Sequence, residues 1–157
     1  MGTIRNFQEL RRDGKVIDAS MNVETMIELG WGPEKIIRVQ WDSDEQSISC
    51  SNAHGLLAKV LPSGDAIALL EETIESGSAR LSVVNADGST RYVIPNTQVF
   101  NGENLTGEFC WFEPAIEDPS QCFGVIFQCN EESGGMKQIQ FDFEAAAGHA
   151  VKAYLVK

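Results

Sequence analysis

The sequence predicts a mainly β protein of the α+β type. We expect a single antiparallel twisted sheet, a sandwich or a partly closed barrel of hairpins, with one short N-terminal helix. From Lys35 onward, apolar and polar residues alternate with a period of two, as half-buried strands require. Turn-forming residues recur roughly every eight to fifteen positions, and only one short stretch has helical periodicity. With 157 residues, 43% of them hydrophobic, residues 1–157 are expected to form a single domain.

The first forty residues are predicted to combine two strands and the helix. A strand over 4–10 leads to the turn signal Asp13-Gly14, after which an apolar run resumes. Ser20 is predicted to cap the helix, in which Val23, Met26 and Ile27 share one face. The helix is expected to end at a glycine, Gly30.

The remainder of the chain is predicted to be strands. In the strand over 36–42, Ile37, Val39 and Trp41 fall on one face of a half-buried strand. Asp87-Gly88 gives the strongest hairpin signal, because this pair adopts the positive φ that tight turns need. Phe109 and Trp111 alternate with apolar neighbours, which predicts a central strand packed on both faces. Further strands are expected over 48–50, 56–61, 66–70, 80–84, 91–94, 123–127, 136–143 and 149–156.

Residues 55–70 and 81–95 each resemble the hairpin of a β-propeller blade, in which an apolar strand meets a glycine turn and a second apolar strand. A closed propeller needs roughly four or more blades of four strands, which is more than this chain supplies. The resemblance therefore implies an open, twisted meander of blade-like hairpins. No activity of the propellers is carried over.

The sequence indicates a cytoplasmic protein without membrane contact. No stretch approaches the roughly 18 apolar residues of a membrane span, and the N-terminus lacks the basic-then-apolar order of a secretion signal. Because most of the cysteines fall in apolar strand-like runs, we expect buried free thiols, and because none of them forms a Cys-x-x-Cys pair, we expect no zinc site. These cysteines are Cys50, Cys110, Cys122 and Cys129.

No catalytic motif is recognisable. His54 and His149 lie beside glycines and are expected in turns. A histidine in such a turn needs no catalytic role to explain its presence. Asp142 and Glu144 project from one strand face, and we expect that face to be solvated. The alternative is that they hold a divalent ion for phosphodiester chemistry, with His149 and Lys152 across a hairpin. The sequence thus predicts no catalytic residue, no metal and no cofactor.

Acidic residues are distributed unevenly. Residues 1–41 hold six acids and six bases, so 17 of the 23 acids and 6 of the 12 bases fall in 42–157 and supply the net charge of −11. This charge repels nucleic acid. Either it serves solubility, or acidic loops converge into a patch that steers a basic protein partner. The candidate partner-binding residues are Asp42, Asp44 and Glu45; Glu71, Glu72 and Glu75; and Glu113, Glu117 and Asp118.

In its small size, its acidity and its lack of catalytic motifs, the chain resembles the immunity proteins that bacteria make against their own toxins. The resemblance implies a non-enzymatic protein that neutralises a cognate basic toxin domain, for example a nuclease, by occluding its active site. An aromatic such as Trp31 or Trp111 would then anchor the interface.

Two other functions stay open at this point. One is a small-ligand-binding protein or hydrolytic enzyme with an aromatic-lined pocket in a barrel mouth, formed by Trp41, Trp111, Phe112 and Phe127. The other is a subunit of a larger assembly whose sheet edges pair with neighbours.

Overall fold

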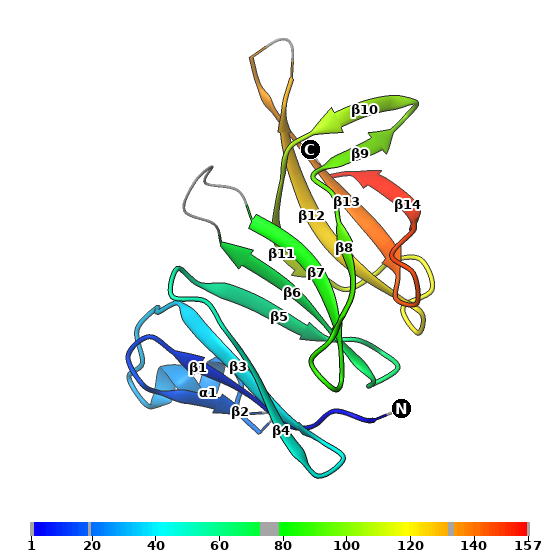
Figure 1. The fold of residues 1–157 in the computed structure, drawn as a ribbon. Coiled ribbons are helices and arrows are strands. Elements are labelled where there is room, and N and C mark those ends of the chain that lie inside the picture. The colour runs from blue at the N-terminus through cyan, green and yellow to red at the C-terminus, as the bar shows by residue number, and fades with distance from the viewer. Residues whose placement is uncertain (1, 19, 73–78, 132–133, 157) are drawn as a thin grey trace.

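The computed structural model describes residues 2–18, 20–72, 79–131 and 134–156. Within these ranges the chain forms three four-stranded antiparallel sheets, a two-stranded ribbon and one short helix (Figure 1). The mainly β class predicted from the sequence is confirmed. The sheets stack on one another instead of curling into a barrel, so the chain is a layered sandwich.

The N-terminal sheet has the strand order β2-β1-β3-β4. Its strands are β1 (Arg5–Arg11), β2 (Val16–Asp18), β3 (Ile36–Ser43) and β4 (Gln46–Ser51). Helix α1 (Val23–Glu28) lies in the connection from β2 to β3. The cap of α1 is Asn22, whose side chain accepts a hydrogen bond from Thr25 N, and the prediction of Ser20 as the cap is wrong. Ser20 instead donates to Asp18 from both its amide and its hydroxyl, which closes a turn before the helix.

The central and C-terminal sheets are both simple meanders. The central sheet runs β5 (Leu56–Val60), β6 (Ala66–Glu72), β7 (Ala79–Asn85) and β8 (Thr90–Ile94). The C-terminal sheet runs β11 (Glu108–Glu113), β12 (Cys122–Asn130), β13 (Met136–Glu144) and β14 (Ala150–Leu155). The blade-like hairpins expected at 55–70 and 81–95 are therefore neighbours in one sheet.

A ribbon of β9 (Thr97–Phe100) and β10 (Glu103–Thr106) separates these two sheets along the chain. Sequence reasoning missed this ribbon, although its turn carries the pair Asn101-Gly102, a strong hairpin signal. Both residues have positive φ, 52° and 80°, as a tight hairpin turn of this type requires.

The central sheet is buried on both faces. In β6 every residue from Ala66 to Leu70 is at most 3% exposed. Ala66, Ala68 and Leu70 face a core shared with the C-terminal sheet, whereas Ile67 and Leu69 face a second core. The three sheets thus form three layers with the central sheet in the middle, as Figure 1 shows.

The two cores differ in composition. The core between the central and C-terminal sheets is rich in phenylalanine, with ring centroids 5.2 to 6.1 Å apart among five rings. These rings belong to Phe109, Phe123, Phe127, Phe141 and Phe143. The core against the N-terminal sheet is centred on Val39 and Trp41, as the alternation of β3 predicted. The indole of Trp41 donates to the carbonyl of Ala86 at 2.7 Å, which ties β3 to the turn after β7.

Strand β11 lies at an edge of its sheet, so its prediction as a central strand is wrong. The pairing with β12 shifts register between Phe109 and Trp111. This bulge inserts Cys110 into the ladder and rotates the following residues. As a result Phe109 and Phe112 both pack against the core, whereas Trp111 is exposed.

The doubly buried position of β6 predicts a large effect of truncation there. We expect Leu69→Ala to lower the free energy of unfolding by about 2–5 kcal/mol, because it removes buried methyl groups from a tightly packed site. Leu57→Ala on neighbouring β5 is the matched control, since Leu57 is partly exposed, and should cost about 1 kcal/mol or less. Urea denaturation of both variants measures the difference, and equal losses would contradict the layered packing.

Asp65 gives the fold a specific pH dependence. The Ser63 hydroxyl donates to its carboxylate and Arg91 on β8 lies 3.3 Å away, and both lower the pKa of Asp65 against the opposing effect of burial. A carboxyl group whose pKa is lower in the folded state stabilises the fold above its unfolded pKa and loses that contribution as the pH falls through the folded pKa.

We therefore expect Asp65→Asn to destabilise the protein at pH 7 and to have a shrinking effect below about pH 4. Chemical denaturation from pH 7 to pH 2.5 tests this expectation. A difference between wild type and variant that stays constant over this range would refute it.

Candidate partner-binding surface

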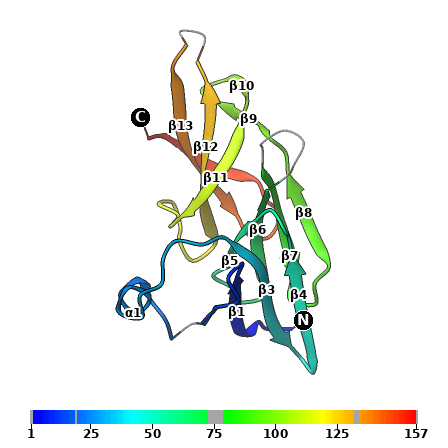
Figure 2. The same ribbon diagram turned by 90° about the vertical axis from the view of Figure 1, so that its left-hand side faces the viewer.

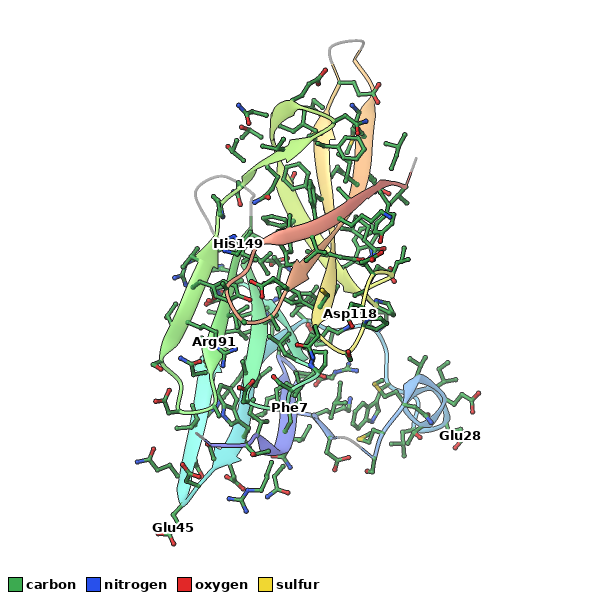
Figure 3. All side chains as sticks on the ribbon, turned by 90° about the vertical axis from the view of Figure 1, so that its right-hand side faces the viewer. Phe7, Glu28, Glu45, Arg91, Asp118 and His149 are labelled. Carbon is green, nitrogen blue, oxygen red and sulfur yellow. The ribbon has the colours of Figure 1, made fainter. Side chains whose placement is uncertain are left out.

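The first predicted acidic cluster lies at the β3–β4 turn. Asp44 and Glu45 are exposed at the tip, and the Asp42 carboxylate accepts hydrogen bonds from Asn6 (2.8 Å) and Ser47 (3.0 Å). These two bonds lower the pKa of Asp42 and keep it ionised. In Figure 3 Glu45 marks the far end of this hairpin.

The second cluster lies at the opposite end of β3. Glu72 forms an ion pair with Lys35, the residue that precedes β3, and Glu71 lies 3.5 Å from Arg80. Glu75 falls outside the described residues. Since β3 starts beside Lys35 and ends at Ser43, the first and second clusters lie at its two ends. They do not form the one convergent patch that the sequence suggested.

The third cluster surrounds the end of β11. Glu113 accepts a hydrogen bond from the indole of Trp111 (2.8 Å), and Glu117 lies 3.9 Å from Lys152. Asp118 is exposed and accepts from Ser120. Exposed apolar side chains, those of Trp111 and Ile116, accompany these acids. Exposed aromatic side chains are enriched in protein-binding surfaces, where charged groups occupy the solvent-accessible rim.

Asp142 fixes the loop that carries this third cluster. Its side chain is fully buried, and one carboxylate oxygen accepts the backbone amides of Ile116 (2.9 Å) and Glu117 (2.8 Å). The other oxygen accepts from Gln140 at 3.0 Å. The expectation that Asp142 faces solvent is therefore wrong, because the loop after β11 folds back over this face of the sheet. Alternation alone carries no sign of that loop.

Glu144 and the histidines have structural positions. Glu144 accepts from the backbone amides of Ala147 (2.8 Å) and His149 (3.4 Å) and so closes the β13–β14 turn. His54 lies in the β4–β5 turn, where its amide donates to Asn52. Within residues 2–18, 20–72, 79–131 and 134–156, no group of three His, Cys, Asp or Glu residues is placed to hold a metal ion.

A cleft of about 800 Å³ separates β5 from β11, which are edge strands of two different sheets. Charged groups of both signs line it, among them Arg12, Lys35 and Glu72, and so do His54 and Cys110. Burial and the neighbouring Glu108 raise the pKa of the Cys110 thiol, which donates to the Glu108 carbonyl. A nucleophilic cysteine needs a lowered pKa, so this thiol is not activated.

The cysteines are free thiols, as expected from the sequence, but they are not uniformly buried. Cys122 and Cys129 lie in the core, whereas Cys50 and Cys110 are half-buried. The four aromatics of the alternative pocket are also separated. Trp41 and Phe127 belong to different cores, and Trp111 points to solvent. The described part of the chain contains no helix long and apolar enough to cross a membrane.

No protein-family model matches the sequence, and no curated protein matches it. A solved structure does, namely a chain in the structure of Tne2 in complex with Tni2. The two chains superpose with a TM-score of 0.87 and are 32% identical, and the match covers 98% of this chain and 99% of the other. This chain belongs to the same family as that protein. The match extends over all three sheets, so the shared feature is the complete fold.

Asp142 offers a test of how the third cluster is held. We expect Asp142→Asn to lower the free energy of unfolding by about 2 kcal/mol, because an amide cannot accept from three donors as a carboxylate does. Glu103→Gln is the control, since Glu103 is exposed on β10, and should change stability by less than about 0.5 kcal/mol. Thermal and urea denaturation measure both variants. Equal stability of the two would show that Asp142 does not secure the loop.

Proposed function

We propose that this chain is a non-enzymatic immunity protein that binds a cognate toxic enzyme and occludes its active site. The carrying observation is its membership in a family of which another member was solved as part of a complex between two proteins, Tne2 and Tni2. That complex supports a protein partner for this chain. The proposed partner is a basic protein, of which a toxin domain with nuclease activity is one example.

The inhibitor role is favoured over an enzyme role by the chemistry of the described residues. The Cys110 thiol in the cleft has a raised pKa, and the candidate carboxylate pair, Asp142 and Glu144, accepts hydrogen bonds from backbone amides. The aromatic pocket of the alternative hypothesis has no support either, because its residues lie in different layers. A small-ligand enzyme is therefore the weaker candidate.

The basic character proposed for the partner follows from electrostatics. A net charge of −11 on 157 residues attracts a positively charged surface over a range set by the Debye length, about 8 Å at physiological salt. Some acids are compensated within the chain, as Glu71 and Glu72 are by Arg80 and Lys35. The first and third clusters keep more of their charge free, and Glu45 and Asp118 are the clearest examples.

The proposal predicts a tight complex with the product of the adjacent reading frame. Co-expression should yield a 1:1 complex and protect cells from that product. Because steering between opposite charges weakens with salt, raising NaCl from about 0.05 to 0.5 M should lower the association rate constant about tenfold or more. Surface plasmon resonance measures the rate, and growth of the co-expressing strain measures protection.

A charge variant separates steering from folding. Glu117→Lys with Asp118→Asn should slow association several-fold without changing the melting temperature, because both side chains are exposed and asparagine tolerates the φ of 44° at position 118. Glu103→Lys on β10 is the matched exposed control. If the wild-type chain neither binds that product nor protects cells from it, the immunity function is refuted. Unchanged association of the double variant would remove the third cluster from the interface.

A further inference from the structure

The connection between β2 and β3 stands away from the three layers. We call residues 20–34 the acidic arm; it contains α1 and its flanking turns. Figure 2 shows α1 projecting to one side of the stacked sheets, and in Figure 3 Glu28 lies at its outer edge. We propose that the acidic arm enters an apolar, basic-rimmed cavity of the protein partner and anchors the complex. This inference rests on the proposed function.

The arm exposes apolar side chains that the fold leaves uncovered. No residue of α1 is buried, and Val23 and Ile27 are 66% and 68% exposed, more than any other large apolar residue of the described ranges. They are spaced i, i+4 and therefore form one stripe on the helix. Leu29, just after the helix, is also largely exposed. Exposed apolar side chains gathered in one place on a soluble protein mark an interaction site.

A helix this short needs a reason to be ordered. Isolated helices below about 12–15 residues are marginal in water, and α1 has six. The helix is fixed by its cap at Asn22 and by the bond from the Trp31 amide to the Met26 carbonyl (2.9 Å). The chain therefore orders a helix without burying its apolar stripe. Ordering before binding lowers the entropic cost of association.

The base of the arm is clamped to the N-terminal sheet. Arg11, which is buried, donates to the carbonyl of Gly32 at 2.6 Å, and its guanidinium lies 5.2 Å from the centroid of the Trp31 ring. Lys15 lies over the same ring at 5.5 Å. Trp31, an anchor candidate from the sequence, is thus engaged by cations of its own chain. Its position makes it the support of the arm and leaves Val23 and Ile27 as the contact residues.

The charge of the arm specifies the chemistry of the partner surface that binds it. Residues 20–34 hold three acids, Glu24, Glu28 and Glu34, and no base, so all six bases of residues 1–41 lie outside the arm. None of these acids forms a salt bridge among the described residues. An apolar stripe flanked by uncompensated carboxylates fits an apolar cavity rimmed by Lys or Arg. This is the helix-in-groove mode of recognition with charge complementarity added.

The same features argue against two other binding partners of the arm, a second copy of this chain and an anionic membrane. A second copy of this chain carries the same net charge of −11 and would bring the acids of two arms together. An anionic lipid surface repels an arm with three acids and no base. The cleft between β5 and β11 also begins at the base of the arm, because Glu34, Lys35 and Ile36 line it. A protein seated over the arm therefore meets a concave surface beside it.

Truncation of the stripe tests the proposal. Val23→Ala with Ile27→Ala should weaken binding to the product of the adjacent reading frame by about 30-fold or more, as loss of a central anchor does. The melting temperature should stay unchanged, because both side chains are exposed and alanine favours helix. Val99→Ala with Leu155→Ala is the matched control: both residues are 60% exposed, on β9 and β14, and binding should be unaffected.

The outcomes separate this inference from the proposed function. If the wild-type chain binds the partner and the stripe and control variants bind with equal affinity, the proposed role of the acidic arm is refuted and the immunity function is retained. No binding by the wild-type chain would overturn both. Should the stripe variant melt early, a photo-crosslinking residue at position 27 decides the matter in the otherwise intact chain. Crosslinks to the partner from position 27 and none from position 155 support the arm, and the reverse pattern overturns it.

Discussion

Burial of the central sheet on both faces is the constraint on which the rest of this structure depends. Strand β6 supplies Ala66, Ala68 and Leu70 to one core and Ile67 and Leu69 to the other. Each outer sheet packs one apolar face against the central sheet, and the loop after β11 covers part of the other face of the C-terminal sheet. The layers thus form a scaffold, and any partner must be recognised by outer faces, edges, loops and the acidic arm.

Charge divides this outer surface into compensated and uncompensated parts. Near the cleft, Glu72 pairs with Lys35 at the start of β3, and Glu71 pairs with Arg80 on the neighbouring strand of the central sheet, so these two acids are compensated. At the arm the carboxylates have no ion-pair partner among the residues that the structure describes, and exposed apolar groups accompany them. The net charge of the first 41 residues is zero, yet all six of their bases and only three of their six acids lie outside the acidic arm.

Periodicity predicted the local structure well where one face of a strand is buried in a regular ladder. The alternation around Val39 and Trp41 and the Asp87-Gly88 turn are confirmed, the latter by the φ of 91° at Gly88. Features that depend on distant segments were not predictable in this way. Phe109 and Trp111 change faces because of a bulge, and Asp142 is buried by a loop that begins some 28 positions earlier in the sequence.

The sequence predicted which types of residue form the candidate partner surface, but not how these residues are arranged in space. The acidic clusters lie at turns and strand ends as expected, but two of them lie at opposite ends of β3 and the third lies at the end of β11. The apolar periodicity of Val23 and Ile27 correctly indicated a helix, and a buried face was the natural inference from it. Only the three-dimensional arrangement shows that this face is exposed, because the two cores are complete without it.

Hydrogen exchange, measured on the chain alone and in its 1:1 complex, tests the central claim that a rigid layered scaffold carries an exposed binding arm. In the free protein the amides of β6 should exchange slowest, and those of α1, which is ordered but lies outside both cores, should exchange faster than those of β6. On complex formation the α1 amides should become protected while β6 stays unchanged. An α1 segment that gains no protection in the complex would contradict this account.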